Sequence, residues 1–534
     1  MNVLQILRFF LPGENPLGFG LADAIEFFVA LLGFAAILLR VRIVAGARWI
    51  AARPPVAMGL LAVLPGGLRL ALLRHHPVPI PTVPDDFSFL LLADTLSHFR
   101  LANPVHPMHR FFESLFILHE PSYSSIYPLG QGIVLALFGH PWAGVLISAG
   151  IFAALCFWML RAWVAPAWAL CGGLIAVATF GPLNKWMNDY WGGTVSAIAG
   201  CLVFGALPRL RKSGSRRDAL LLGLGLAIQL LTRPFESLLL DAVVLAMLFP
   251  LRRQYLWIAL PVVAASMLTM AHNRAVTGEW LTLPYLVSRA QYGVPATFTF
   301  QANATPHRLL TAEQQLAFEV ETAAHDHPVS WPERLRSIRF FLLPPLFAAI
   351  PFALRRRWVW AFAVVALFYG GTVFYPYFHP HYIAAVACLF LLLAVAGLER
   401  LSALRTEAAM VLLIFCAAHF AFWYGLHLTG TPAIFSATSS YQASDYINYG
   451  DAEGRIAIAR KLAAESGSQL VFVRYGTAHT VREWVQNAAN IDQARIVWAL
   501  DRGEEENHEL RNYYPGRKAW LLDPDVRPPR LTPY

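Results

Sequence analysis

The chain has 534 residues, of which 57% are hydrophobic and only 14% are charged. Soluble domains carry about 25% charged residues, so this composition excludes an ordinary soluble protein and indicates a membrane protein. The net charge of +9 does not indicate a nucleic-acid partner, because membrane proteins collect basic residues in their short cytoplasmic loops. The five cysteines all lie in apolar stretches without CxxC spacing, a pattern that excludes a disulfide framework.

Apolar runs and basic clusters together predict how the chain crosses the membrane. A spanning helix needs about 20 apolar residues, and arginine and lysine mark the cytoplasmic loops. Basic clusters lie at 40–53, 209–217, 252–253, 355–357 and 400–405. All of them fall on one side if the chain crosses in pairs between them, which leaves both termini on the non-cytoplasmic side. About twelve spans are expected, at 20–40, 54–73, 132–160 with a break at 139–141, 166–183, 190–207, 218–233, 236–250, 255–271, 339–354, 358–375, 382–398 and 407–427.

Three larger segments then face outward. They are the first loop (74–131), the second loop (272–338) with a predicted helix at 311–326, and the polar tail (428–534). Within the tail, hydrophobic patterning predicts a helix at 451–465 and strands at 470–475, 495–500 and 519–523.

The expected fold is therefore an α-helical polytopic membrane protein with surface helices in its first loop and a small α/β domain at its C-terminus. The expected parts are an extra N-terminal span and cytoplasmic loop (1–53), a transmembrane domain (54–427) and the outward α/β domain (428–534).

Two adjacent carboxylates stand at the start of an apolar stretch in the first loop. Asp85 and Asp86 follow the proline-rich segment 77–84 and precede 87–96, which suits a helix lying along the membrane surface. One aspartate is explained as a helix cap, but two exceed what a cap needs. A carboxylate here can act as a general base on an acceptor hydroxyl or amine, or hold a divalent cation against a phosphate. Asp86 is nearer the helix and better placed to cap, so Asp85 is the preferred base.

Further polar residues in the first loop are candidate substrate-binding groups. Glu113, His119 and Glu120 lie between the acidic pair and the next span. The histidines of this loop show no HExxH or similar zinc-ligand spacing. A metal ion bridging Asp85 or Asp86 with His119 or Glu120 is therefore only a secondary hypothesis.

Charged residues at the outer ends of later spans form a second set of candidates. Arg233 ends one span, and Glu236 follows it by three residues. Charges at a membrane boundary tend to be functional, but a self-neutralising pair at helical spacing is an equal alternative. Lys185 stands in the aromatic turn 184–193, where it can attract a phosphate; the aromatic side chains of that turn fit either sugar stacking or interface anchoring.

The order of these features resembles the GT-C superfamily of membrane glycosyltransferases. That superfamily includes the lipid A aminoarabinose transferases, the protein O-mannosyltransferases and the bacterial RgtA-like proteins. Its members carry an acidic pair in the first outward loop, then surface helices, then a KYPPGQ-like entry to the next span. Here the counterparts are Asp85 with Asp86, the stretch 87–126, and IYPLGQG at 126–132, which contains Tyr127 and has Ile126 in place of the lysine.

A second resemblance lies late in the chain. Many GT-C proteins have an Arg-Tyr or His-Tyr step where the chain re-enters the membrane, and it is thought to meet the donor's phosphate. The stretch YPYFHPHYIAAV at 375–386 supplies His381 and Tyr382 at this step, with His379 beside them. The similarity extends over roughly 54–427.

The resemblance implies a glycosyltransferase in the bacterial inner membrane, with its active site facing the periplasm. It implies a polyprenyl-phosphate-linked sugar donor, an unknown lipid, glycan or protein acceptor and surrounding membrane lipids; a divalent cation is the only cofactor considered. One alternative is a transporter or flippase of lipid-linked sugars, against which stands the absence of an internal sequence repeat. Another is a membrane scaffold whose tail binds a partner, which leaves the acidic first loop unexplained.

Overall fold

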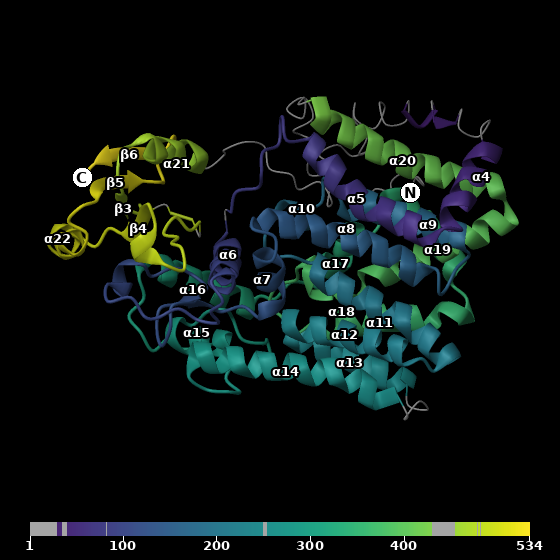
Figure 1. Ribbon diagram of the computed structural model, residues 1–534, viewed down its shortest axis with the longest axis horizontal. Coiled ribbons are helices and arrows are strands. Elements are labelled where there is room, and N and C mark those ends of the chain that lie inside the picture. Colours follow the sequence, from purple (N-terminus) through teal and green to yellow (C-terminus); the bar gives the residue numbers. More distant parts are fainter. Residues whose placement is uncertain are drawn as a thin grey trace.

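The computed structural model describes residues 29–31, 33–34, 40–81, 83–248, 254–429, 454–477, 479–480 and 482–534. These residues form a mainly helical body and a small β-sheet near the C-terminus (Figure 1). The expected span at 20–40 falls almost entirely outside the described residues, and so do Arg252 and Arg253.

The helices and strands follow one another along the whole described chain. In order they are α4 (Arg40–Ala51), α5 (Pro54–Ala71), α6 (Pro84–Ser97), η1 (His109–Phe111), β1 (Ile117–Leu118), β2 (Ser124–Ser125), α7 (Leu129–Ala136), α8 (Pro141–Leu160), α9 (Pro166–Phe180), α10 (Lys185–Asn188), α11 (Thr194–Ser213), α12 (Arg216–Thr232), α13 (Pro234–Leu248), α14 (Tyr255–Thr277), α15 (Pro284–Tyr292), α16 (Ala312–Asp326) and α17 (Trp331–Arg336). They continue with η3 (Ser337–Phe340), η4 (Pro344–Ala348), η5 (Ile350–Ala353), η6 (Arg356–Trp358), α18 (Val359–Gly371), η7 (Pro380–Val386), α19 (Ala387–Leu404), α20 (Thr406–Thr429), α21 (Arg455–Ala464), β3 (Gln469–Val473), η9 (Ile491–Gln493), β4 (Ile496–Leu500), α22 (Glu504–Tyr513), β5 (Lys518–Asp523) and β6 (Arg530–Pro533).

Within the described residues, six helices are long and apolar enough to cross a membrane. They are α5, α8, α11, α14, the continuous η7–α19 and α20, and each overlaps a predicted span. The chain is thus an integral membrane protein. The predicted break at 139–141 is confirmed, because α7 ends at Ala136 and α8 begins at Pro141. The total of twelve spans stays a prediction.

One predicted span is wrong in its local structure. Residues 339–354 form no continuous α-helix but the short 3₁₀ turns η3, η4 and η5. Pro344, Pro345 and Pro351 lie in this stretch, and a proline inside a helix removes a backbone donor and clashes with the preceding turn. An apolar run is therefore not sufficient here to form a regular helix.

Two glycines allow the backbone to approach closely where the later site is built. A Cβ on Gly130 of α7 would lie 2.2 Å from Thr232 Oγ1, so glycine brings the segment after Tyr127 against the end of α12. A Cβ on Gly200 of α11 would lie 1.7 Å from the Ala385 carbonyl oxygen, so glycine lets η7 rest on α11. Small residues are used for close backbone contacts in membrane helices in this way.

The first loop is folded into the protein. Its helix α6 begins at Pro84, a residue favoured at the first helical position, and most of its apolar side chains, including Phe87, Leu91 and Leu92, are buried by other parts of the chain. The helix expected from the apolar stretch is confirmed, but it does not present a free apolar face to a membrane surface. α6 packs instead against α7 and β2.

The tail contains a four-stranded sheet in the order β4-β3-β5-β6. β3 pairs in parallel with β4 and β5, and β6 pairs antiparallel with β5. β3, β4, β5 and α21 lie where the sequence predicts them, whereas β6 and α22 are not among the predicted elements. One face of the sheet packs through Leu470 and Phe472 against Phe111 and Phe112 of the first loop. In Figure 1, α6 and α16 lie between this sheet and the helical body.

Candidate functional site

The acidic pair lies in the first turn of α6, where the positive end of the helix dipole favours negative charge. Val83, which has no capping side chain, is the N-cap residue, so the expectation that Asp86 caps the helix is wrong. Asp86 is only 3% exposed, and its Oδ1 accepts a hydrogen bond from the Tyr190 backbone N–H at 2.9 Å. Asp85 is half-buried and therefore within reach of a ligand.

Asp85 is held by Tyr127, from the segment that enters α7. The Tyr127 hydroxyl donates a hydrogen bond to Asp85 Oδ1 at 2.5 Å, and the Tyr127 ring stacks on Phe89 with centroids 4.3 Å apart. Burial raises the pKa of Asp85 above its ordinary value, although the Tyr127 hydrogen bond and the charges of Lys185 and Arg233 lower it. A fixed carboxylate with a raised pKa suits proton abstraction at neutral pH.

Arg233 provides a positive charge that acts on this carboxylate. It lies at the junction of α12 and α13, and its Nε donates to Glu236 Oε1 at 2.8 Å. Its guanidinium carbon also lies 4.6 Å from the ring centroid of Tyr382. Glu236 is 1% exposed, whereas Arg233 and Tyr382 are half-buried. The expected self-neutralising pair therefore forms, and it also holds the cation against Tyr382.

Lys185 provides a second positive charge through the aromatic turn before α11. Its Nζ lies 3.5 Å from Asp189 Oδ2 and 4.4 Å from the ring centroid of Trp191. Trp191 in turn contacts His379 and His381, with ring centroids 5.5 and 5.2 Å apart. The structure thus connects Lys185, through Trp191, to His379 and His381 at the start of η7.

The His-Tyr step lies next to Arg233 and Trp191. The rings of His379 and His381 stack with centroids 5.4 Å apart, and the His381 ring lies 4.8 Å from that of Tyr382. All three side chains are half-buried. Asp85, Tyr127, Lys185, Arg233, Glu236, His379, His381 and Tyr382 are therefore linked by contacts and charges into one candidate site, from five separate segments of the chain.

Sequence reasoning missed Glu321 on α16. Burial raises the pKa of Glu321 to about 7, an Ala296 backbone N–H that donates to it at 2.7 Å lowers the pKa, and the Asp85 charge raises it. The loop after Ala296 reaches the site, because Phe298 packs on Phe235 with ring centroids 4.9 Å apart. The second loop thus contributes a carboxyl group that titrates near neutrality.

Three predicted residues lie elsewhere. Glu113 and Glu120 pair with Arg308 of the second loop, Glu113 at 3.7 Å. His119 is 1% exposed and packs beside Tyr123, with ring centroids 5.3 Å apart. Burial lowers the pKa of His119 to about 4, so this histidine is neutral at pH 7. These residues join the two loops to each other, and their expected role in binding substrate is not supported by their positions.

The described residues do not bring together the side chains named in the secondary metal hypothesis. Across the described ranges, no group of three or more His, Cys, Asp and Glu side chains is arranged to hold a metal ion. Asp85 and Asp86 are held by Tyr127 and the Tyr190 backbone, while His119 and Glu120 lie in the cluster around Arg308. The combination proposed from the sequence is not assembled.

Comparison with known proteins identifies the fold. No family model and no curated protein matches the chain. The crystal structure of ArnT from Cupriavidus metallidurans bound to undecaprenyl phosphate matches with a TM-score of 0.50 over 87% of this chain and 92% of that one, at 11% sequence identity. The chain has the GT-C fold.

Two archaeal structures match less well. The Archaeoglobus fulgidus oligosaccharyltransferase in complex with Zn and sulfate gives a TM-score of 0.42, with 12% identity over 88% of this chain and 67% of that one. The oligosaccharyltransferase AglB from the same organism, in complex with an inhibitory peptide and a dolichol-phosphate, gives 0.36 with 11% identity over 88% and 69%. The GT-C fold assignment rests on the ArnT structure and confirms the fold that the resemblance implies.

The hydrogen bond between Tyr127 and Asp85 leads to a prediction for the pH dependence of this candidate site. Replacing Tyr127 by phenylalanine removes a donor that stabilises ionised Asp85, so the Asp85 pKa should rise further. A hydrogen bond to a charged group contributes about 1.5–3 kcal/mol, or about one to two pH units. We expect the acidic limb of kcat/KM to move upward by that amount in Tyr127→Phe. The matched control is Tyr190→Phe, whose hydroxyl donates to the Pro79 carbonyl; equal profiles for both variants contradict the assignment.

A second buried polar cluster joins the tail to both loops. His479 lies 2.7 Å from Asp525 and 3.4 Å from Glu313 of α16. Glu483 accepts hydrogen bonds from the Tyr475 hydroxyl at 2.9 Å and from the Leu115 backbone N–H of the first loop at 3.2 Å. α16 therefore connects this cluster, through Glu313, with Glu321 in the site.

We expect the contacts of this cluster, which join the tail to the two loops, to become less stable as the pH rises. Burial and the Glu313 charge raise the pKa of Glu483 to about 8, against an ordinary value of 4.5. Burial lowers the pKa of His479, but Glu313 and Asp525 outweigh it and raise this pKa. When the tail is docked on the two loops, Glu483 keeps a proton that it loses when the tail separates from them. The equilibrium constant for docking should therefore fall by about tenfold per pH unit between about 5 and 8 from Glu483 alone.

Hydrogen exchange at residues 110–118, corrected for intrinsic rates, measures this effect, with α22 as the internal control. If protection from exchange at Leu115 changes with pH in the same way as protection in α22, the predicted pH effect on the cluster is contradicted.

Proposed function

We propose that this protein transfers a sugar from a polyprenyl-phosphate donor to an acceptor at the outer face of a bacterial inner membrane. The observation that carries the proposal is the half-buried Asp85, held by Tyr127 and influenced by two cations, Lys185 and Arg233. A base placed near positive charge is what the displacement of a phosphate by a hydroxyl or amine requires.

In the proposed reaction, Asp85 takes the proton from the acceptor's hydroxyl or amine. The acceptor atom forms a bond to the anomeric carbon, and the bond from that carbon to the phosphate oxygen breaks. The electron pair leaves with the oxygen, so the second product is the polyprenyl phosphate. Direct displacement of this kind inverts the anomeric centre.

The leaving phosphate is placed near Arg233, Lys185 and the His-Tyr step. Preorganised positive charge and hydrogen-bond donors at the position where negative charge develops are among the largest contributions to catalysis. Arg233 presents a planar fork of donors that suits phosphate, and Tyr382 lies under it at 4.6 Å. Glu236 and Asp189 hold the two cations in place before a donor arrives.

The position of the His-Tyr step at the end of a membrane span supports a donor that is carried by a lipid. His381 and Tyr382 lie at the beginning of the apolar helix Pro380–Leu404, where a lipid headgroup meets the end of a span. The related fold of ArnT was solved with undecaprenyl phosphate bound, which supports a polyprenyl-phosphate carrier as the donor here.

The test uses purified protein in nanodiscs and a panel of radiolabelled polyprenyl-phosphate sugars, with and without candidate acceptors. Sugar leaving the lipid fraction is the expected result for at least one donor. Saturable donor binding with no bond cleavage across the panel favours the alternative of a transporter or flippase.

A further inference from the structure

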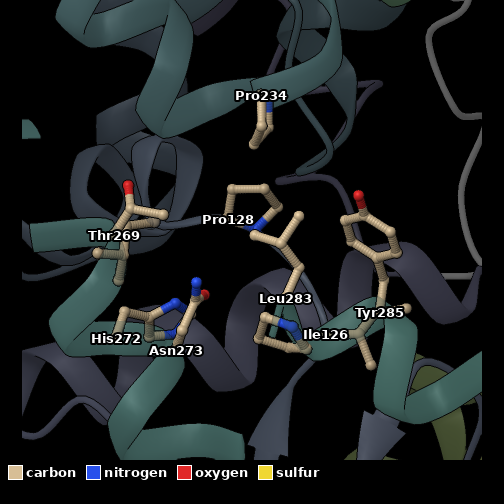
Figure 2. A pocket seen from close by; sticks show the side chains of 10 residues that line it. Ile126, Pro128, Pro234, Thr269, His272, Asn273, Leu283 and Tyr285 are labelled. Atoms are coloured by element: carbon tan, nitrogen blue, oxygen red, sulfur yellow. The ribbon is translucent and has the colours of Figure 1, made fainter. Parts of the chain in front are cut away.

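A small cavity lies directly behind the site. It is lined by the segment entering α7, by Pro234 of α13, by α14 and by the beginning of α15, and its volume is about 10 Å³. A cavity of about 10–15 Å³ holds one water molecule. Pro128 and Pro234, the residues that follow Tyr127 and Arg233, both form part of its wall (Figure 2).

Two side chains on α14 bring unpaired polar atoms to this cavity. His272 is 2% exposed and Asn273 is 4% exposed, yet His272 Nε2 and Asn273 Oδ1 have no hydrogen-bond partner within the described chain. Figure 2 shows both side chains directed toward Pro128 and Leu283. Buried polar atoms are almost always hydrogen-bonded, so a ligand in the cavity is the simplest partner for both.

The chemistry of the pair restricts the ligand. Asn273 Oδ1 is an acceptor only, and its amide nitrogen is already used in a hydrogen bond to the Trp280 carbonyl at 3.2 Å. The neutral imidazole of His272 can donate or accept at Nε2. The remaining wall is largely apolar, with Ile126 and Leu283 among its residues. A hydroxyl group, which donates to Asn273 and pairs with His272, satisfies both atoms within this volume.

We propose that His272 and Asn273 form a binding site for a single hydroxyl group. Two sources supply that chemistry: a water molecule, or a hydroxyl of the transferred sugar reaching past Tyr127. The second source rests on the proposed function, and it would make His272 a specificity-determining residue for the donor. Tyr285 lines the same cavity; burial raises the Tyr285 pKa, the Arg289 charge lowers it, and the Glu236 charge raises it.

The first arm of the test needs no donor. A map of the full-length protein that resolves ordered water should show one peak within hydrogen-bond distance of His272 Nε2 and Asn273 Oδ1. The peak should disappear in His272→Phe, which keeps the ring and removes the nitrogen. It should remain in Thr269→Val, which alters the wall while removing a hydroxyl already bonded to the Ala265 carbonyl. An empty cavity in the wild type overturns the proposal.

The second arm separates the two sources, with the donor that supports turnover. If a sugar hydroxyl enters the cavity, His272→Phe should lower kcat/KM by on the order of tenfold relative to Thr269→Val, and a donor-bound map should show the sugar in place of water. If water alone binds, the peak persists with donor bound and the two variants have equal kcat/KM. The first arm does not depend on turnover. It therefore tests the hydroxyl-binding site even if the proposed function is wrong.

Discussion

Replacing Asp85 by asparagine should reduce sugar transfer by about 10²–10⁴-fold, the range typical of losing a general base. Asparagine keeps the shape of the side chain and can still accept the Tyr127 hydrogen bond, so the loss should appear in kcat and leave the fold intact. The half-buried position of Asp85 and its raised pKa are what single it out. The measurement is single-turnover transfer from a labelled donor.

Asp86→Asn is the matched control for this variant. Asp86 is 3% exposed and bonded to the Tyr190 backbone N–H, and an asparagine oxygen can accept the same bond. We expect Asp86→Asn to retain transfer within about tenfold of the wild type and to lower thermal stability instead. Loss of transfer in Asp86→Asn with full activity in Asp85→Asn would reverse the assignment of the base.

Replacing Arg233 should affect both stability and catalysis. In Arg233→Gln, Glu236 keeps its charge at 1% exposure and loses its 2.8 Å partner. Removing one member of a buried pair destabilises a protein by about 3–5 kcal/mol. The same change removes a cation from the developing phosphate charge, for which losses of about 10²–10³-fold in kcat are typical.

A double variant separates the two effects. Arg233→Gln combined with Glu236→Gln removes both charges, so most of the stability should return while transfer stays low. Arg233→Lys keeps the charge and loses the planar fork and the stacking on Tyr382, so it should fold normally and raise the KM for the donor. Thermal unfolding and steady-state kinetics measure the two properties, and recovery of transfer in the double variant contradicts a role of Arg233 at the phosphate.

Much of the site could be predicted because its residues occur at recognisable points in the chain. Asp85, Tyr127, Arg233 and His381 each lie where a loop meets an apolar run. Because spans begin and end at the membrane surface, residues at such junctions lie at a similar depth in the membrane. The start of α6 could also have been read more accurately, because Pro84 is typical of the first helical position. That signal places both aspartates inside the first turn and leaves neither of them as the cap.

The second loop could not be interpreted from the sequence in the same way. α16 carries Glu313, Glu319 and Glu321, and only the packing of the loop decides that Glu313 meets His479 while Glu321 faces the site. The same limit explains Glu113 and Glu120, which share a loop with Asp85 but turn toward Arg308. Closeness in sequence within a loop of this length does not determine closeness in space.

The most direct test of the central claim is ³¹P NMR of a polyprenyl-phosphate sugar incubated with the protein in nanodiscs together with candidate acceptors. A glycosyltransferase converts the donor's phosphodiester into a phosphomonoester. We predict that the phosphomonoester signal grows with the wild type in proportion to glycosylated product, and that it is nearly absent with Asp85→Asn. A phosphodiester signal that persists while the wild-type protein binds the donor contradicts the proposed transfer and favours a protein that holds lipid-linked sugar without breaking it.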